Sequence, residues 1–256
     1  MARLEVHQFP CLRDNYGYLI HDSDHDVTAA IDTPEAGPIN QALAEKGWTL
    51  THILNTHHHF DHAGGNLELK ERWHCTIVGN ANDASRIPGI DVKVVDGDTY
   101  DFGGHTARIF DVSGHTLGHI AYYFAEDGML FCGDTLFALG CGRLFEGTPE
   151  QMWTSLQKLM NLPDDTVVYC AHEYTQANAK FALTVEPRND QLQARAKEID
   201  RMRADGKPTV PSTIGLEKAT NPFLRPTSEA LQETIGLRGA RPVEVFAETR
   251  RRKDNF

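Results

Sequence analysis

The chain has 256 residues, of which 40% are hydrophobic and 24% charged, and its formal net charge is −11. This composition is typical of a folded protein of one or two domains and excludes a disordered, fibrous or low-complexity chain. The acidic balance argues against nucleic acid or an anionic membrane as a partner. No apolar run approaches the roughly 18 residues that a membrane-spanning helix needs, and the first residues lack the apolar stretch of a signal peptide. We expect a cytoplasmic location and a monomer.

The cysteines indicate a reducing compartment. Five is an odd number and no pair has the CxxC spacing, so the sequence predicts neither a disulfide framework nor a thiolate zinc cage. We expect reduced thiols at Cys11, Cys75, Cys132, Cys141 and Cys170.

Short strands rich in β-branched and aromatic residues are predicted in the first two thirds of the chain. In order they cover residues 4–9, 16–21, 27–32, 51–56, 76–78, 106–112, 120–124, 129–132 and 166–170. Helices are predicted among them over residues 39–46 and 66–72. The capping box Thr148-Pro149-Glu150-Gln151 opens a further helix through Leu159. Strands and helices therefore interleave.

The last third of the chain has a helical pattern. Apolar residues recur at helical spacing over 174–185 and 192–202, before Gly206-Lys207-Pro208 breaks the pattern. Further helices are predicted over 228–235 and 242–252. We therefore expect two domains, over residues 1–172 and 173–256.

Histidines are concentrated in one short segment. Residues 55–65 read Asn-Thr-His-His-His-Phe-Asp-His-Ala-Gly-Gly, where a predicted strand ends. Alternate side chains of an extended chain share a side, so we expect His57 and His59 to lie together. The following turn can bring Asp61 and His62 to a neighbouring point. One segment can therefore serve two metal ions.

Three further candidate ligands also follow predicted strands: His115, Asp134 and His172. The carboxyl ends of strands line a common crevice in sheets of this kind, so residues distant in sequence can converge there. Five histidines and two aspartates suffice for a dinuclear centre with one bridging carboxylate. A surface or core role is the better interpretation of a lone histidine, but it does not explain so many imidazoles at one strand end.

Neighbouring residues are expected to support the site. We expect His58 and His119 to be structural or to orient ligands, because metal-bound imidazoles usually need a partner on the other ring nitrogen. Asp32 fits either support of a ligand histidine or a turn at the end of a strand.

These motifs resemble the metallo-β-lactamase superfamily and, within it, the hydroxyacylglutathione hydrolase family, also called glyoxalase II. The matching segments span nearly the whole chain. They are THHHFDHAGGN at 56–66, GHTLGH at 114–119, GDTLF at 133–137, GCGRLFEGT at 140–148, HEYT at 172–175 and NPFLR at 221–225. The first is typical of the whole superfamily, whereas 140–148 and the helical tail are more specific to this hydrolase family.

The resemblance implies an α+β fold, an αββα sandwich with a C-terminal helical domain. Residues 1–172 would then form the catalytic domain and residues 173–256 the substrate-binding domain. Two divalent metal ions are implied, of which we expect zinc, with iron or manganese as alternatives. The implied ligands are His57, His59 and His115 on one ion, Asp61, His62 and His172 on the other, and Asp134 between them.

The implied reaction is the hydrolysis of S-(2-hydroxyacyl)glutathione, typically S-D-lactoylglutathione, to glutathione and D-lactate, the second step of methylglyoxal detoxification. We expect a metal-bridging hydroxide as nucleophile, with Asp134 and Asp61 as catalytic carboxylates. A thioester suits this site because a thiolate leaves without a strong general acid. No Gly-x-Ser-x-Gly elbow is present, and Cys132 and Cys170 lie in apolar strands, where a buried structural thiol is expected.

Basic residues outnumber acidic ones at the C-terminal end of this acidic chain. Arg250 and Lys253 share one face of the predicted helix, where they can bind carboxylates of an anionic peptide; a solvated basic tail is the alternative. The resemblance implies that both residues, with Arg143 and Tyr174, contact glutathione. Phe145 stands where many relatives have Tyr, so one hydroxyl contact to glutathione would be missing.

Two other classes of function stay open. The first is another enzyme on the same scaffold, such as a glutathione persulfide dioxygenase, a lactamase or a nuclease, which the net charge and the helical tail disfavour. The second is a metal-binding module without turnover, which the full ligand set disfavours.

Overall fold

The computed structural model describes residues 3–256. The chain divides into two compact units. The N-terminal unit runs to Asp111 and resumes over Gly118–Gly133, and the C-terminal unit comprises Val112–Leu117 and Asp134–Phe256. The predicted domain boundary at residue 172 stays a prediction, because compact packing units and independently folding domains need not coincide.

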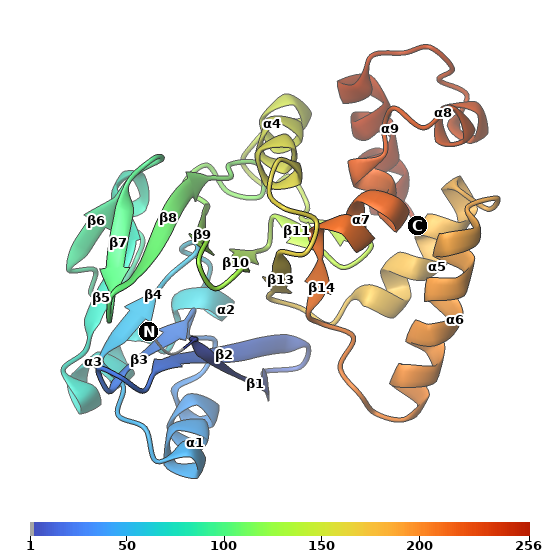
Figure 1. Cartoon of the computed structure of the whole chain (residues 1–256). Coiled ribbons are helices and arrows are strands. Elements are labelled where there is room, and N and C mark those ends of the chain that lie inside the picture. The colour runs from blue at the N-terminus through green and yellow to red at the C-terminus, as the bar shows by residue number, and fades with distance from the viewer. Residues whose placement is uncertain (1–2) are drawn as a thin grey trace. The chain divides into compact units, whose positions relative to one another are not determined.

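The N-terminal unit contains a six-stranded sheet, coloured blue to cyan-green in Figure 1. Its strands lie side by side in chain order: β1 (Glu5–Cys11), β2 (Asn15–Asp22), β3 (Val27–Ile31), β4 (His52–Leu54), β5 (Thr76–Asn80) and β6 (Val92–Val94). The first three strands are antiparallel and the last four are parallel. Parallel neighbours need crossover connections, and α1 (Ala36–Lys46) and α3 (Asn66–Trp73) supply two of them.

These two helices cover one face of the sheet. Apolar side chains spaced along α1 and α3 form a buried cluster with apolar residues of the strands; it includes Leu19, Ile39, Leu43, Ile53, Leu69 and Ile77. Burial of this kind contributes about 1.5–3 kcal/mol for each large side chain, so the cluster fixes the sheet and the loops at its edge.

A second sheet of the same unit packs on the other face. It contains β7 (Thr99–Phe102), β8 (His105–Asp111), β9 (Ile120–Phe124) and β10 (Met129–Gly133), each antiparallel to the next. The rings of Tyr18 and Phe131 meet between the sheets at 6.0 Å. The hydroxyl of Tyr122 donates to the carbonyl of Asn55 at 2.9 Å. The N-terminal unit is therefore a two-sheet sandwich with helices outside the first sheet.

The C-terminal unit is mainly helical. Its helices are α4 (Pro149–Met160), α5 (Thr175–Val185), α6 (Asp190–Ala204), α7 (Ile214–Thr220), α8 (Glu229–Ile235) and α9 (Pro242–Asp254). It also holds two short antiparallel strand pairs, β11 (Leu136–Phe137) with β12 (Gly140–Cys141), and β13 (Val167–Cys170) with β14 (Ser212–Thr213). The remaining elements are single turns. The N-terminal unit contains α2 (Phe60–Ala63) and η1 (Ala81–Asp83), and the C-terminal unit contains η2 (Pro222–Leu224).

The predicted capping box of α4 is confirmed. The Thr148 hydroxyl accepts a hydrogen bond from the Gln151 backbone N–H at 3.3 Å, and the Gln151 side-chain oxygen accepts one from the Thr148 N–H at 2.9 Å. The α+β class with a helical C-terminal region is also confirmed. Among residues 3–256, no helix is long and apolar enough to cross a membrane.

Candidate metal centre

The histidine segment follows β4 and begins one part of the candidate site. His57 is fully buried and His59 is half-buried. Their facing nitrogens, Nε2 of His57 and Nδ1 of His59, lie 3.1 Å apart. The predicted pairing of these two side chains is therefore present in the N-terminal unit.

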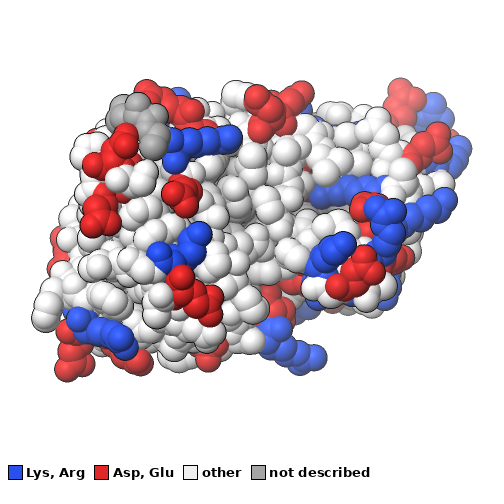
Figure 2. Space-filling model, turned by 60° about the horizontal axis from the view of Figure 1, so that its bottom comes forward, with Lys and Arg blue, Asp and Glu red and all other residues white. Residues whose placement is uncertain are grey.

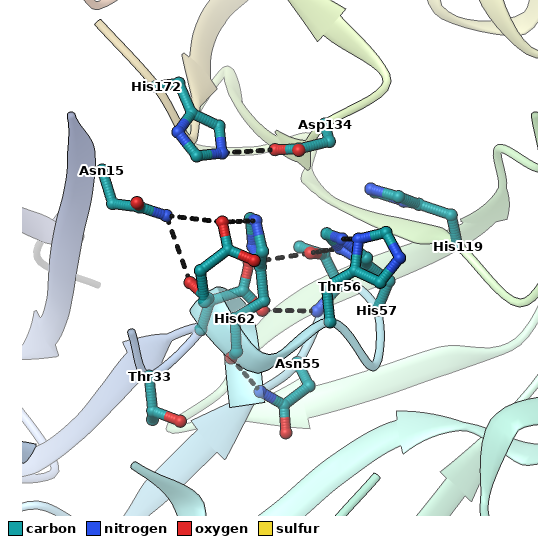
Figure 3. A network of polar contacts seen from close by, with 12 residues as sticks. Asn15, Thr33, Asn55, Thr56, His57, His62, His119, Asp134 and His172 are labelled. Carbon is teal, nitrogen blue, oxygen red and sulfur yellow. Dashed lines mark hydrogen bonds and ion pairs between the residues drawn. The ribbon is translucent and has the colours of Figure 1, made fainter. Parts of the chain in front are cut away.

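Asp61 and His62 lie on α2, one turn further along the chain, and form a second pair. Nε2 of His62 lies 3.5 Å from Oδ2 of Asp61. The Asn15 amide donates to the same Asp61 oxygen at 3.2 Å and to the Asp61 carbonyl at 3.1 Å, as the dashed lines from Asn15 in Figure 3 show. Asn15 thus orients a candidate ligand, a role that the sequence did not suggest.

The Asp32 carboxylate accepts hydrogen bonds from Thr56, which precedes His57, and from His62. Its Oδ2 accepts hydrogen bonds from His62 Nδ1 at 2.8 Å and from the Thr56 hydroxyl at 2.7 Å, while its Oδ1 accepts the Thr56 N–H at 2.7 Å. Asp32, His57 and His62 also form a close group of potential ligands. The described oxygen contacts of Asp32 all go to Thr56 and His62, so we assign it to orienting His62. Its φ of 58° directly after β3 also fits the strand-ending turn that the sequence offered as the alternative.

The C-terminal unit carries the other three candidate ligands in an arrangement centred on Asp134. Oδ2 of Asp134 lies 3.4 Å from Nε2 of His115, and Oδ1 lies 3.3 Å from Nε2 of His172. Figure 3 shows His172 directed at Asp134. The Arg143 carbonyl accepts a hydrogen bond from His115 Nδ1 at 2.9 Å, which leaves Nε2 of that ring turned to Asp134. One carboxylate therefore faces two imidazoles, one with each oxygen.

These distances fit the coordination of metal ions. Ligand atoms that lie about 2.0–2.1 Å from a tetrahedral zinc ion are about 3.3 Å from one another. The four pairs, two in each unit, are separated by 3.1, 3.5, 3.4 and 3.3 Å. All contain imidazole nitrogen or carboxylate oxygen, the donors that zinc, iron and manganese accept.

His58 and His119 each donate a hydrogen bond through Nδ1, as expected of structural or ligand-orienting histidines. His58 Nδ1 donates to Oδ2 of the buried Asp83 at 3.0 Å, and its ring meets that of His59 edge-on at 4.9 Å. The ring of His119 stacks on that of His57 at 4.5 Å, and its Nδ1 donates to the Ile120 carbonyl at 3.1 Å.

The predicted basic substrate residues gather around Asp254 in the C-terminal unit. Arg250 is buried and pairs with Asp254 at 2.8 Å, and the exposed Arg143 approaches the same carboxylate at 4.0 Å. Lys253 donates to the Ala177 carbonyl at 3.2 Å. Burial, together with the charges of Arg250 and Arg143, lowers the pKa of Lys253 to about 8. Three cations against one carboxylate leave an excess of positive charge that suits an anionic ligand.

Tyr174 lies beside a candidate metal ligand. Its ring stacks flat on that of His172 at 4.7 Å and meets Phe137 edge-on at 5.5 Å. Phe145 is more exposed and meets the ring of His115 at 5.1 Å. Both aromatic residues predicted to border the substrate therefore contact a candidate ligand.

Acidic and basic side chains are interspersed on the face drawn in Figure 2. Many of the surface cations form ion pairs, including Lys218 with Asp164 at 2.6 Å and Arg188 with Glu233 at 2.8 Å. The described side chains on that face form no continuous basic strip of the kind that follows a nucleic-acid backbone.

Two family models match consecutive parts of the chain. The one described as Metallo-beta-lactamase superfamily matches residues 26–172, and the one described as Hydroxyacylglutathione hydrolase C-terminus matches residues 173–256. The hydroxyacylglutathione hydrolase of Methylococcus capsulatus is 57% identical, over 99% of both proteins. That of Rhodospirillum rubrum is 56% identical over the full length of both.

Solved structures share the fold. The crystal structure of ETHE1 from Myxococcus xanthus has a TM-score of 0.67 at 28% identity, covering 97% of this chain and 98% of that one. BLEG-1 B3 metallo-beta-lactamase has a TM-score of 0.66 at 22% identity, covering 86% of this chain and 100% of that one. The family expected from the motifs is confirmed: this chain belongs to the hydroxyacylglutathione hydrolase family of the metallo-β-lactamase superfamily.

Proposed function

We propose that this protein hydrolyses S-(2-hydroxyacyl)glutathione, with S-D-lactoylglutathione as the type substrate, to glutathione and the free 2-hydroxy acid. The observation that carries the proposal is similarity over the whole chain to relatives named hydroxyacylglutathione hydrolase. The family models match both residues 26–172 and the C-terminal residues 173–256. Water adds to the thioester carbonyl and the carbon–sulfur bond breaks, so the products are a carboxylate and a thiol.

The seven candidate ligands would form one centre for two metal ions, most simply zinc. His115 would complete the His57–His59 pair and His172 the pair on α2, with Asp134 between the ions. Supporting this assignment, the two oxygens of Asp134 face different imidazoles in the C-terminal unit. Two ions bound in this way lower the pKa of a water molecule and polarise a carbonyl.

The protein's own residues would orient the ligands and hold the substrate. Asp32 keeps the proton of His62 on Nδ1, so that Nε2 can act as a ligand. Arg143, Arg250 and Lys253 would bind the carboxylates of glutathione, and Tyr174 would border the peptide. The leaving group is a thiolate, and a free thiol has a pKa of about 8.5. The thiolate can therefore leave without a strong acid beside it.

A cysteine nucleophile is the competing chemistry for a thioester. Burial raises the pKa of Cys170 to about 12 and that of Cys141 to about 11. Both are therefore protonated at neutral pH, which makes them poor nucleophiles. This supports hydrolysis by water rather than through an acyl-cysteine.

The five cysteines, all within the described residues, form no disulfide and are buried, which favours a reducing compartment such as the cytoplasm. A small glutathione thioester is the only partner that the proposal requires. We propose that the protein acts as a monomer.

The test is loss of thioester absorbance with S-D-lactoylglutathione, combined with elemental analysis. We expect turnover by the metal-loaded protein, loss of turnover on chelation and recovery when zinc is returned. Asp134→Ala and His59→Ala should lose metal and turnover, whereas the exposed Asp165→Ala serves as a control and should keep both. Absence of hydrolysis by the loaded protein, or full activity after the metal has been removed, would overturn the proposal.

A further inference from the structure

A two-stranded hairpin in the C-terminal unit directly follows Asp134. It pairs Leu136 with Cys141 and Phe137 with Gly140, leaving Ala138 and Leu139 as the turn. Leu139 has a φ of 59°, in the left-handed region, which costs an ordinary L-residue about 1–2 kcal/mol. A turn of this kind must be stabilised by its surroundings.

Side chains from the C-terminal helical elements bond to every residue from 137 to 140. The Asn221 amide donates to the carbonyls of Phe137 at 3.1 Å and Gly140 at 2.9 Å. The Asn178 amide donates to the Ala138 carbonyl at 3.1 Å. Glu217 accepts the Leu139 N–H at 2.8 Å.

Glu217 is a fully buried carboxylate with four hydrogen-bond donors around it. Arg195 and the Ser212 hydroxyl each donate to its Oε1 at 2.5 Å, and Asn221 and Leu139 donate to its Oε2 at 3.0 and 2.8 Å. A buried charge is tolerated only when it is paired and fully bonded in this way. Glu217 and Asn221 therefore form a rigid support for the hairpin.

The base of the hairpin carries groups of the candidate site. The Gly142 backbone packs against Asp134 so closely that an added Cβ would lie 2.0 Å from the Asp134 carbonyl oxygen. The Cys141 carbonyl accepts the Arg250 guanidinium at 2.8 Å, and the carbonyl of residue 143 accepts His115. A displaced hairpin would therefore move Asp134, His115 and Arg250 together.

We propose that Glu217 and Asn221 are positioning residues, which act through the hairpin to hold Asp134 for metal and Arg250 for the substrate. This rests on the proposed thioester hydrolysis for its kinetic part only. Neither residue touches metal or substrate; their effect on both passes through the peptide groups of residues 137–141.

Asn221→Asp is the sharpest variant. The side chain keeps its shape, and its oxygen can still accept the Phe223 N–H that caps η2. It loses both N–H donors to the hairpin carbonyls and places a carboxylate beside Glu217. We expect metal affinity and kcat/KM to fall about 10–100-fold, the usual effect of removing support from a metal ligand. We expect kcat to fall and KM to rise together, with faster deuterium uptake over residues 134–143.

Asn189→Asp is the matched control. The Asn189 oxygen likewise caps a helix, by accepting the Leu192 N–H at 3.1 Å, and its amide donates to a carbonyl, that of Ala219, at 3.0 Å. Because this carbonyl lies outside the hairpin, Asn189→Asp should leave metal affinity, kcat and KM at wild-type values. If Asn221→Asp does not fold, Asn178→Asp, which removes the single bond to Ala138, is judged by the same measurements and should change them in the same direction.

The two proposals can fail separately. If the wild-type protein does not cleave the thioester, the proposed function fails, while metal affinity and deuterium uptake still test the positioning role. If the wild-type protein cleaves the thioester, and the folded Asn221→Asp or Asn178→Asp variant matches Asn189→Asp in metal affinity, kinetics and deuterium uptake, the positioning role is wrong.

Discussion

Oδ2 of Asp32 accepts a hydrogen bond from Nδ1 of His62 at 2.8 Å, and both side chains are buried. Because a carboxylate can only accept, the imidazole proton is fixed on Nδ1 and the lone pair on Nε2. That lone pair faces the side where Oδ2 of Asp61 lies 3.5 Å away. A residue outside the proposed ligand set thus fixes which ring nitrogen of His62 carries the proton.

Asp32→Asn tests this relationship. The amide can accept through only one of its two terminal atoms, so it cannot accept both the Thr56 backbone N–H, now bonded to Oδ1, and the His62 Nδ1–H, now bonded to Oδ2. We expect metal affinity to fall about 10–100-fold, with the fold retained because Asn tolerates the φ of 58° at this position. Titration with a chelator measures the affinity. The matched control is Asp91→Asn, which weakens the contacts of Asp91, in the loop before β6, to Lys70 and Ile77. This variant should bind metal normally.

Lys253→Ala tests the basic cluster. A half-exposed charge interaction contributes up to about 1 kcal/mol, so we expect KM for the glutathione thioester to rise up to about fivefold, with metal content unchanged. The rise should shrink as ionic strength increases. Lys218→Ala removes a cation that pairs with Asp164 and should leave KM unchanged. An unaltered KM in Lys253→Ala would mean that this lysine does not bind substrate.

The lowered pKa of Lys253 predicts a pH dependence. Burial disfavours the charged amine, and the neighbouring arginines add repulsion, so the pKa lies at about 8. As pH rises through 8 the amine loses its charge, and KM should increase. Lys253→Arg stays charged and should lack this increase in KM. The comparison separates titration of Lys253 from titration of the substrate. Parallel KM profiles for the two proteins would contradict the assignment.

The same shift has a consequence for stability. Between about pH 8 and the ordinary lysine pKa near 10.4, the unfolded chain binds more protons at this position than the folded one. The free energy of unfolding therefore gains a positive contribution with rising pH in that window. Comparing wild type with Lys253→Ala by denaturant titration isolates the contribution, and equal slopes for the two would argue against a lowered pKa.

Phe145→Tyr adds the hydroxyl that the family resemblance led us to expect at this position. Phe145 is 63% exposed and lies against the His115 ring, so a hydroxyl at its edge can reach bound substrate without repacking. One added hydrogen bond contributes about 1 kcal/mol, and we expect KM to fall about fivefold with kcat and metal content unchanged. A higher KM would show that the apolar edge is itself the preferred contact.

Periodicity and turn signals predicted most of the longer elements, because their apolar patterns are strong. Elements that the sequence did not predict include β6, β7 and α7, as well as α2 and the two-residue strands β11, β12 and β14. The strands at Val92–Val94 and Thr99–Phe102 have three and four residues with charged members, and their pairing depends on neighbours distant in sequence. The helix at Ile214–Thr220 contains Gly215 and is fixed by the buried Glu217, a tertiary effect that local propensity does not contain.

The candidate ligands were predictable because metal chemistry needs particular side chains, and these stand together in the sequence or just after strands. His58, His119 and Asp32 could be expected to support the site, but Asn15 and Asn221 could not. Asn15 reaches Asp61 from a separate antiparallel strand. Asn221 lies in the NPFLR motif, but that motif does not indicate that its amide donates to two carbonyls more than 80 positions earlier. Such contacts leave no local pattern in the sequence, so they can be identified only from the folded structure.

The proposed function requires two metal ions to share one centre. Anomalous scattering from crystals of the zinc-loaded protein tests this requirement. We expect two zinc peaks about 3.5–4 Å apart, one bound by His57, His59 and His115, the other by Asp61, His62 and His172, with Asp134 touching both. A single peak, or zinc bound within residues 55–65 with Asp134 and His172 remote from it, would contradict a shared centre.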